Sequence, residues 1–237
     1  MPIYMMRAII MPDYLCFTAE QANSTVKLEK NWSPTTVTLE TSTDWSAWTT
    51  YTIGDTITLA SIGDKVYWRN TSETATWFST GTSNYYRFRI WWLVWASGDV
   101  NFLLCKNSTT TLVWDYCFCC LFQNQTKLTM PPQTPATTLT QNCYRGMFAG
   151  CTWLLWITNM PALNYPNNCC YQMYSSCSKI KLSTTQTWDY QTPYRIPSEW
   201  TWSVWTSSFY VMFGSTWWTF TWDITINTTY YTSNTVV

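Results

Sequence analysis

Apolar and polar side chains alternate with a period of two along the first half of the chain. The alternation recurs in short stretches at Thr25–Glu29, Thr36–Glu40, Thr56–Leu59, Lys65–Arg69 and Tyr86–Ile90. Turn-forming residues separate such stretches about every 8–12 positions, which is typical of an antiparallel β-sandwich. We predict such a sandwich over residues 14–97, preceded by an N-terminal extension at 1–13. The predicted inward-facing residues are Val26, Leu28, Val37, Leu39, Ile57, Leu59, Val66, Trp68, Phe88 and Ile90.

A longer period governs the second half, where like residues recur every 26 positions. The aligned columns are Cys117, Cys143 and Cys169; Leu121, Met147 and Met173; Phe122, Phe148 and Tyr174; Leu128, Leu154 and Ile180; and Cys151 and Cys177. A repeat of about 20–30 residues is typical of a solenoid, in which each unit buries its apolar face by stacking on its neighbours. We therefore predict a stack over residues 98–182 and a capping region over 183–237.

The four-residue spacing inside one unit predicts a helical turn. Cys143, Met147 and Cys151 would form one buried stripe of that turn. A short extended piece, Trp153–Ile157, and a corner containing proline would follow. Phe209–Phe213 would be a degenerate fourth helical turn.

These motifs support a family resemblance. The pattern Met147-Phe148-x-x-Cys151-x-x-Leu154, with Pro135–Leu139, resembles the BspA-type leucine-rich repeats of bacterial cell-surface proteins and some phage proteins. The first half resembles the β domain that often precedes those repeats, in the stretches Phe17–Glu20, Ser24–Val26, Tyr51–Asp55 and Ile62–Tyr67. The resemblance implies a mixed, β-rich fold with an N-terminal antiparallel β-sandwich, a short leucine-rich-repeat-like solenoid and a C-terminal cap. It also implies adhesion or recognition at a bacterial surface or on a phage particle.

Tryptophan departs from that pattern, because many of the 18 Trp stand in turns where the backbone favours glycine, and the chain has only 7 Gly. Hairpin turns of type I′ need positive φ at both central residues, which glycine tolerates best. The positions that would carry glycine in such relatives are Trp32, Trp45, Trp77, Trp188, Trp200, Trp202, Trp205, Trp217, Trp218 and Trp222. We hypothesise that UGA codons for glycine have been decoded as tryptophan. Trp48 and Trp68, in contrast, match ordinary sandwich aromatics.

Composition excludes several classes of function. The 13 basic and 13 acidic side chains cancel, so nothing favours electrostatic capture of nucleic acid or of an anionic bilayer. The absence of histidine excludes Ser-His-Asp and Cys-His catalysis and every metal site that needs histidine. No apolar run approaches the about 20 residues of a membrane span. We therefore expect a protein without enzymatic activity, cofactor or membrane span.

The cysteines and carboxylates have structural interpretations. Cys117–Cys120 and Cys169–Cys170 come closest to metal-ligand spacing, but we interpret the column cysteines as small buried hydrophobes, with disulfides or a metal as alternatives. A catalytic carboxylate pair is not expected, because no Asp or Glu lies between Asp115 and Asp189. The aspartates beside turn signals are expected to cap those turns, namely Asp44, Asp55, Asp64, Asp99 and Asp223.

Clustered aromatic residues are the candidate partner-binding positions. They are Trp200, Trp202, Trp205, Tyr230 and Tyr231, and the three tryptophans lose that meaning if they replace glycine. The function that we expect is adhesion or recognition outside the cell, on a bacterial surface or a virion. Thr, Asn and Tyr side chains on the stack would contact a glycan or protein partner, with no nucleic acid involved. The alternative is a structural spacer or virion component of the tail or fibre type, with no ligand of its own.

Overall fold

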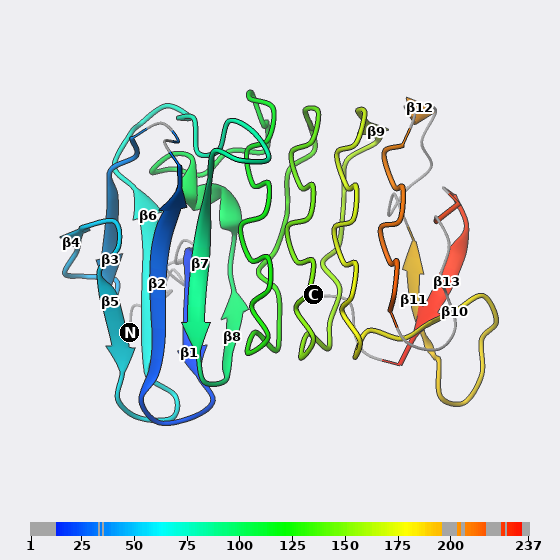
Figure 1. Ribbon diagram of the computed structural model, residues 1–237, viewed down its shortest axis with the longest axis horizontal. Helices are drawn as coiled ribbons and strands as arrows, with labels where there is room; N and C mark the ends of the chain where they lie inside the picture. Colours follow the sequence, from blue (N-terminus) through cyan, green and yellow to red (C-terminus); the bar gives the residue numbers. More distant parts are fainter. Residues whose placement is uncertain are drawn as a thin grey trace, which may run out of the picture.

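The computed structural model describes residues 13–32, 34, 36–195, 203–204, 207–216, 224–225 and 227–233, and within these ranges the fold is β-rich. Strands occupy the two ends of an elongated body, and a row of turn-rich loops joins them (Figure 1). The single helix of the described ranges is the short 3-10 helix η1 (Val100–Leu103). Nearly all of the predicted extension, together with Trp200, Trp202, Trp205, Trp217, Trp218 and Trp222, lies outside the described residues.

Two antiparallel sheets form the N-terminal half. The larger has the order β4-β3-β6-β1-β8 and consists of β1 (Leu15–Ala19), β3 (Leu39–Ser42), β4 (Thr49–Tyr51), β6 (Lys65–Asn70) and β8 (Val94–Ser97). The smaller has the order β5-β2-β7 and consists of β2 (Ser24–Asn31), β5 (Thr56–Leu59) and β7 (Tyr85–Trp91). The predicted strands therefore exist, although β3 begins at Leu39, which is later than the alternation indicated.

Aromatic rings join the inner faces of the two sheets. The Phe88 ring centroid lies 4.7 Å from that of Phe17 and 5.1 Å from that of Trp68. Nine of the ten predicted inward-facing residues are buried, and Ile57 is partly buried against the same core. The period-two pattern is confirmed because only one side of each strand enters this core.

A glycine joins the sheets to the rest of the chain. Gly98 has a φ of +72°, and a Cβ there would lie 2.0 Å from the carbonyl oxygen of Tyr14, so only glycine fits. The next residue, Asp99, accepts a hydrogen bond from the backbone N–H of Asn101 at 2.7 Å and caps η1. Gly98 and Asp99 thus connect β8 to η1 at the start of the second half.

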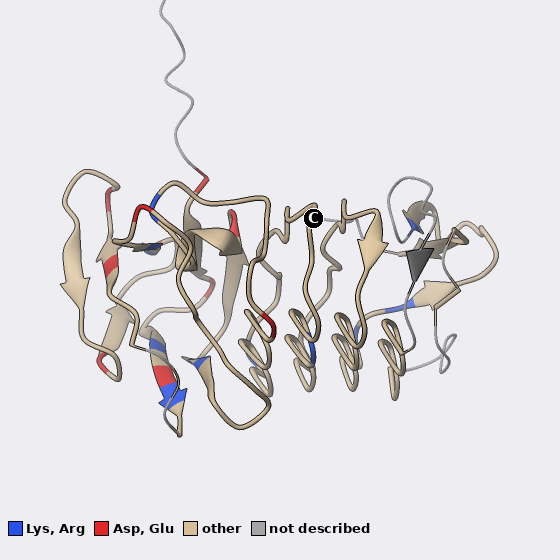
Figure 2. Ribbon diagram, turned by 90° about the horizontal axis from the view of Figure 1, so that it is seen from above, with Lys and Arg blue, Asp and Glu red and all other residues tan. Residues whose placement is uncertain are grey.

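The loops that follow contain four turn segments, residues 116–125, 142–151, 168–177 and 207–216, which lie side by side (Figures 1 and 2). Backbone hydrogen bonds connect each segment to the next. The N–H of Phe118 donates to the carbonyl of Cys143 at 2.8 Å, and the N–H of Tyr144 donates to that of Cys169 at 2.8 Å. Between the third and fourth segments, the N–H of Tyr174 donates to the carbonyl of Met212 at 2.8 Å.

Both helical predictions for these segments are wrong, at Cys143–Cys151 and at Phe209–Phe213. An α-helix needs negative φ throughout and a bond from each N–H to the carbonyl four residues back. Here every fourth residue has a positive φ, and alternate N–H groups donate to the neighbouring segment. The positive-φ residues are Tyr116, Cys120, Asn124, Asn142, Gly146, Gly150, Asn168, Gln172, Ser176, Ser207, Val211 and Ser215. The spacing of four therefore reflects consecutive tight turns.

Equivalent side chains of successive segments are in contact. The ring centroids of Phe122 and Phe148, and of Phe148 and Tyr174, are 5.3 Å apart with planes inclined by 9°. Phe213 of the fourth segment continues this column at 5.2 Å from Tyr174. It follows after 39 residues instead of 26, because a loop with β10 (Leu182–Ser183) and β11 (Thr192–Arg195) is inserted.

The inserted loop belongs to a small sheet at the far end. Its order is β10-β13-β11, with β13 (Thr229–Thr232) antiparallel to both neighbours. Nearby, β9 (Asn164–Tyr165) pairs in parallel with β12 (Ser203–Val204). The predicted extended piece Trp153–Ile157 is not a strand, although the N–H of Leu155 donates to the carbonyl of Thr129 at 3.0 Å.

The first turn segment and the residues that follow it cover one edge of each N-terminal sheet, at β7 and at β8. The N–H of Phe88 in β7 donates to the carbonyl of Leu121 at 2.8 Å, and that of Val94 in β8 donates to the carbonyl of Lys127 at 3.1 Å. Unpaired strand edges are prone to association with other chains, so this pairing protects them. One hydrophobic cluster runs through both halves, from Leu15 to Tyr230.

All ten cysteines are free and buried. The thiol of Cys151 donates to the carbonyl of Phe122 at 3.0 Å, and that of Cys177 donates to the carbonyl of Phe148 at 3.1 Å. These bonds repeat the same contact one segment further along the chain. The column cysteines are therefore packing residues, as predicted, that also satisfy backbone carbonyls.

Among the described residues, three tryptophans adopt the left-handed backbone conformation that favours glycine, whereas Trp77 and Trp188, also predicted as glycine positions, do not. The φ angles are 59° at Trp32, 67° at Trp45 and 64° at Trp92, and the side chains are 78%, 41% and 51% exposed. Trp92 was not among the predicted glycine positions, because the apolar residues around it hide the turn between β7 and β8. Trp68 is fully buried and Trp48 lies under the guanidinium of Arg69 at 4.0 Å, so both are ordinary packing residues.

Replacing Trp92 by glycine is expected to raise the free energy of unfolding by about 1 kcal/mol. Relief of left-handed strain, about 1–2 kcal/mol, outweighs the larger chain entropy that glycine brings to the unfolded state. Trp188→Gly is the matched control, because Trp188 is 83% exposed without a positive φ, so only the entropic cost remains. Urea unfolding curves measure both changes. A Trp92→Gly variant less stable than the parent protein would contradict the claim that the backbone at Trp92 is strained.

Candidate functional site

The predicted aromatic platform is not formed by the described residues. Tyr230 is only 2% exposed, and its hydroxyl accepts a hydrogen bond from the N–H of Thr225 at 2.9 Å. It therefore belongs to the core, which corrects its prediction as a surface residue. Tyr231 is half-buried in β13, opposite Pro193 of β11. Trp200, Trp202 and Trp205 lie outside the described residues.

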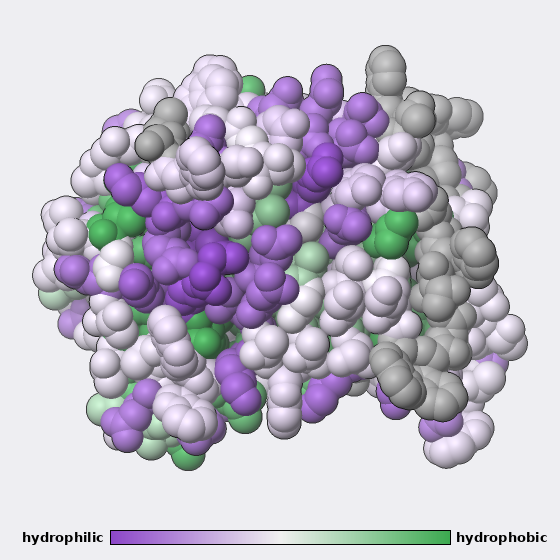
Figure 3. Space-filling view, viewed as in Figure 1, coloured by the Kyte–Doolittle hydropathy of each residue, from purple (hydrophilic) through white to green (hydrophobic). Residues whose placement is uncertain are grey.

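Charged side chains gather instead on the outer face of the smaller sheet. Because Val26 and Leu28 point into the core, their neighbours Lys27 and Glu29 point outward. In the register between β2 and β7, Lys27 lies opposite Arg89 and Glu29 lies opposite Arg87. Figure 3 shows strongly hydrophilic residues over this part of the molecule.

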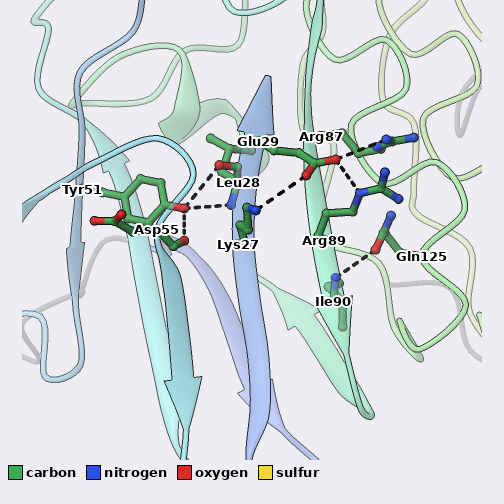
Figure 4. Close-up of polar contacts among 9 residues, drawn as sticks. All are labelled: Lys27, Leu28, Glu29, Tyr51, Asp55, Arg87, Arg89, Ile90 and Gln125. Carbon is green, nitrogen blue, oxygen red and sulfur yellow. Dashed lines mark hydrogen bonds and ion pairs between the residues drawn. The ribbon is translucent and has the colours of Figure 1, made fainter. Parts of the chain in front are cut away.

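Glu29 is the centre of this charged group (Figure 4). Its Oε1 accepts hydrogen bonds from Nε of Arg89 at 2.5 Å and Nη2 of Arg87 at 3.2 Å, and Nζ of Lys27 lies 4.0 Å from its Oε2. Burial raises the pKa of Glu29, but the hydrogen bonds and charges of Arg89 and Arg87 outweigh it and leave the pKa below its usual value. Glu29 is therefore a carboxylate near neutral pH, suited to hold arginines in place rather than to donate a proton.

A hollow of about 340 Å³ opens beside this group. Residues of the sheet and of the first turn segment line it together, namely Glu29, Arg89, Ile90, Trp91, Asn124 and Gln125. The side-chain oxygen of Gln125 accepts the N–H of Ile90 at 2.9 Å, which fixes its amide at the junction (Figure 4). Asn124 lies against Gly150, where a Cβ would be 2.2 Å from its Oδ1. Two amides and an ion pair thus face one concave surface.

A second hollow, of about 290 Å³, is lined by Gln133, Thr134, Pro135, Asn159 and Pro161. It contains no charged side chain. Its polar groups are committed within the protein, since the hydroxyl of Thr134 contacts that of Thr158 at 3.1 Å and the carbonyl of Asn159 at 3.1 Å. The charged hollow is therefore the better candidate for a ligand site.

A row of larger side chains continues across the turn segments. The guanidinium of Arg145 lies 4.4 Å from the ring centroid of Tyr171, a cation–π contact. The Tyr171 and Tyr210 ring centroids are 5.4 Å apart, and Tyr210 is 47% exposed. The three side chains come from the second, third and fourth segments. Because the segments stack in register, the row is aligned along the stack.

Two arginines relate the row to the charged group. The hydrogen bond between the thiols of Cys119 and Cys120 lowers the pKa of Cys120, burial opposes this effect, and the charges of Arg145 and Arg87 lower the pKa further. The guanidinium of Arg87 lies 5.9 Å from the ring centroid of Tyr85, which packs with Cys120. The N–H of Cys120 donates to the carbonyl of Arg145 at 3.0 Å, so Arg87 and Arg145 both adjoin this part of the first segment. We use the name recognition face for the charged group, the hollow and the row together: Lys27, Glu29, Arg87, Arg89, Asn124, Gln125, Arg145, Tyr171 and Tyr210.

Sequence reasoning missed this face. The charged group depends on the pairing of β2 with β7, which joins residues 58 and 60 positions apart. The row had a detectable signal, because Arg145 and Tyr171 are separated by the same 26-residue interval as the apolar columns. The apolar columns indicate which side chains are buried, whereas the polar positions between them form the surface.

Three of the five aspartates predicted to cap turns do so with their side chains, namely Asp44, Asp64 and Asp99. Oδ1 of Asp44 accepts hydrogen bonds from the N–H groups of Ala47 and Ser46, and these bonds lower the pKa of Asp44 to about 2. Asp64 accepts the N–H of Ser61 at 2.9 Å, and Asp99 caps η1. Asp55 contributes its backbone carbonyl, which accepts the Tyr51 hydroxyl, and Asp223 lies outside the described residues.

No protein-family model, curated protein or solved structure matches this chain. Within the described ranges, His, Cys, Asp and Glu side chains nowhere gather in threes or more with the geometry of a metal site. In the same ranges, no helix has the length and apolar character needed to cross a bilayer.

Replacing Glu29 by glutamine is expected to flatten the pH dependence of stability below about pH 5. The folded-state pKa of Glu29 is depressed, so its contribution is complete above the unfolded pKa of about 4.3 and is lost as the pH falls through the folded value. Unfolding curves between pH 3 and pH 7 would show this as a smaller loss in the variant. Glu73→Gln, in a more exposed pair with Lys106, is the control and should follow the parent. A Glu29→Gln curve parallel to that of the parent would exclude the proposed ion-pair contribution.

Proposed function

We propose that this chain is a non-enzymatic recognition protein that binds glycans through the recognition face, outside the cell on a bacterial surface or a virion. The observation that carries the proposal is the aligned row of Arg145, Tyr171 and Tyr210 beside the polar hollow. Arg145 and Tyr210 stack on Tyr171 from the neighbouring segments, so a sugar would contact the outward ring edges and hydroxyls of the row and the exposed part of Tyr210. Charged groups and the exposed amide of Asn124 would bind its hydroxyls. Ligand sites combine these two elements in a concave surface.

We propose further that the stack is a short solenoid of the leucine-rich-repeat type, which continues from the predicted range into the fourth turn segment at residues 207–216 and is capped by the sheet of β10, β13 and β11. The contacts between equivalent rings and the hydrogen bonds between successive segments support this assignment. A stack of this kind presents a rigid, extended surface that suits large partners. The BspA-type relatives suggested by the repeat motif use such a stack outside the cell, and this supports the proposed location.

We also propose that Trp32, Trp45 and Trp92 stand where the natural protein carries glycine, through decoding of UGA. Left-handed backbone at three exposed tryptophans supports the proposal, because such conformations are rare for residues other than Gly, Asn and Asp. The recognition row contains no tryptophan and does not depend on this proposal.

The decoding proposal has a direct chemical test. Intact-mass and peptide mass spectrometry of the protein from its native source is expected to give glycine at positions 32, 45 and 92. Each replacement of Trp by Gly lowers the mass by about 129 Da, which follows from the two residue compositions. Tryptophan detected at these positions in native protein ends the proposal.

Binding to a glycan array is expected, and it should depend on the row. Removal of an aromatic contact of about 0.5–1.5 kcal/mol predicts that Tyr210→Ala weakens binding up to about tenfold, because 1.4 kcal/mol corresponds to a factor of ten. Trp188→Ala is the control, since Trp188 is equally aromatic, highly exposed and outside the row. Circular dichroism and melting temperature should match the parent in both variants.

Two outcomes would count against glycan recognition. A protein that binds nothing on the array would favour the alternative of a structural spacer or virion component. Binding that Trp188→Ala reduces as much as Tyr210→Ala would place the ligand elsewhere on the surface. Neither outcome depends on the assignment of the stack to a repeat family.

A further inference from the structure

The stack has an unusual charge distribution. Residues 116–188 contain Lys127, Arg145, Lys179 and Lys181 and not one Asp or Glu, although the whole chain is neutral. Figure 2 shows that the acidic residues among the described ranges are concentrated on the N-terminal half. A surface without carboxylates does not repel an anionic ligand, and its cations attract one.

The charged group adds to this excess. Lys27, Arg87 and Arg89 surround the single carboxylate of Glu29, which leaves a surplus of positive charge at the hollow. Arg145 adjoins the same region from the second turn segment, since its carbonyl accepts the N–H of Cys120 at 3.0 Å and Cys120 packs with Tyr85 beside Arg87. The positive end of the recognition face therefore combines three arginines and one lysine with one carboxylate.

The arginines also retain unused hydrogen-bond donors. Arg89 donates to Glu29 through Nε, and it lines the hollow with its side chain 34% exposed. Arg87 is largely buried and is held by Glu29, so it supports the carboxylate of Glu29 and leaves Arg89 as the arginine of the sheet that a ligand can reach. An arginine has five N–H donors, and its planar group matches a carboxylate in two parallel bonds. A ligand carboxylate would satisfy donors that the protein leaves open.

We propose that the ligand of the recognition face is an acidic polysaccharide, whose carboxylates bind at Arg89 and Arg145 and whose rings contact the outward edges of Tyr171 and Tyr210. This inference rests on the proposed glycan recognition and specifies its chemical class. The arrangement favours a glycan over a single-stranded nucleic acid. A nucleic acid site follows the backbone with a track of cations, whereas here the cations gather at one end of the row.

Titration calorimetry with paired polysaccharides tests this inference. The probes are oligomers of polygalacturonate, alginate and hyaluronan, each beside its methyl ester, which keeps the sugar and removes the charge. At least one acid is expected to bind tenfold or more tightly than its ester. Its affinity should fall between 50 and 300 mM NaCl, because salt screens the ion pairs.

Matched variants locate the charge dependence. Arg89→Gln and Arg145→Gln are each expected to reduce the affinity for the acid about tenfold more than the affinity for the ester, because both residues contact the glycan but only the acid also loses an ion pair. Arg145→Lys should retain part of the affinity for the acid, because the charge remains but the planar guanidinium is lost. Lys106→Gln removes an exposed cation outside the face and should bind like the parent. The melting temperature of each variant shows whether it is folded.

The outcomes distinguish the two proposals. Equal binding of acid and ester, weakened by Tyr210→Ala, overturns the acidic ligand and leaves glycan recognition standing. If none of the three acids binds while neutral glycans bind on the array, the acidic ligand is likewise overturned and glycan recognition stands. Oligothymidine bound as tightly as the best acid, with the same dependence on Arg145, also overturns the inference. An acid-specific affinity lost in both Gln variants supports it.

Discussion

Backbone hydrogen bonds between successive turn segments are the constraint on which the rest of this molecule depends. In each segment alternate N–H groups close a tight turn, as Met147 does with the carbonyl of Tyr144 at 3.1 Å, and the others donate to the next segment. Both sets can form only if the backbone returns to positive φ every fourth residue. The side chains then leave each segment in the same order, so that Phe122, Phe148 and Tyr174 stack in the core and Arg145, Tyr171 and Tyr210 align outside.

Much of the core could be predicted, because burial imposes a period on the sequence. Alternation located the strands and their inward faces, and the 26-residue interval identified the apolar columns. The local conformation of the segments could not be derived in the same way, since helices and consecutive tight turns both repeat a buried side chain every four residues. Helices and consecutive tight turns differ in the carbonyl that accepts each N–H, and for alternate N–H groups that carbonyl lies in another segment. Tyr230 was misplaced for a related reason: its burial depends on the pairing of β13 with β11.

The candidate site was less accessible to prediction than the core, because two different parts of the chain build it. The sheet supplies Glu29 and Arg89, and the first turn segment supplies Asn124 and Gln125. These groups meet because that segment pairs with the edge of β7, a contact between distant residues that follows from no local pattern. Asn124 in turn depends on the space over Gly150, so one turn segment shapes the polar surface of its neighbour.

The pairing of the first segment with β7 and β8 has a consequence for how such a protein can vary in length. Each of the first three segments donates alternate N–H groups to carbonyls of the following segment in the same pattern. Duplication of the second 26-residue unit would therefore leave the junctions between segments matched and the junction with the sheets unchanged. Evolution could therefore change the length of the molecule in steps of one unit and leave the hollow beside the sheet unchanged.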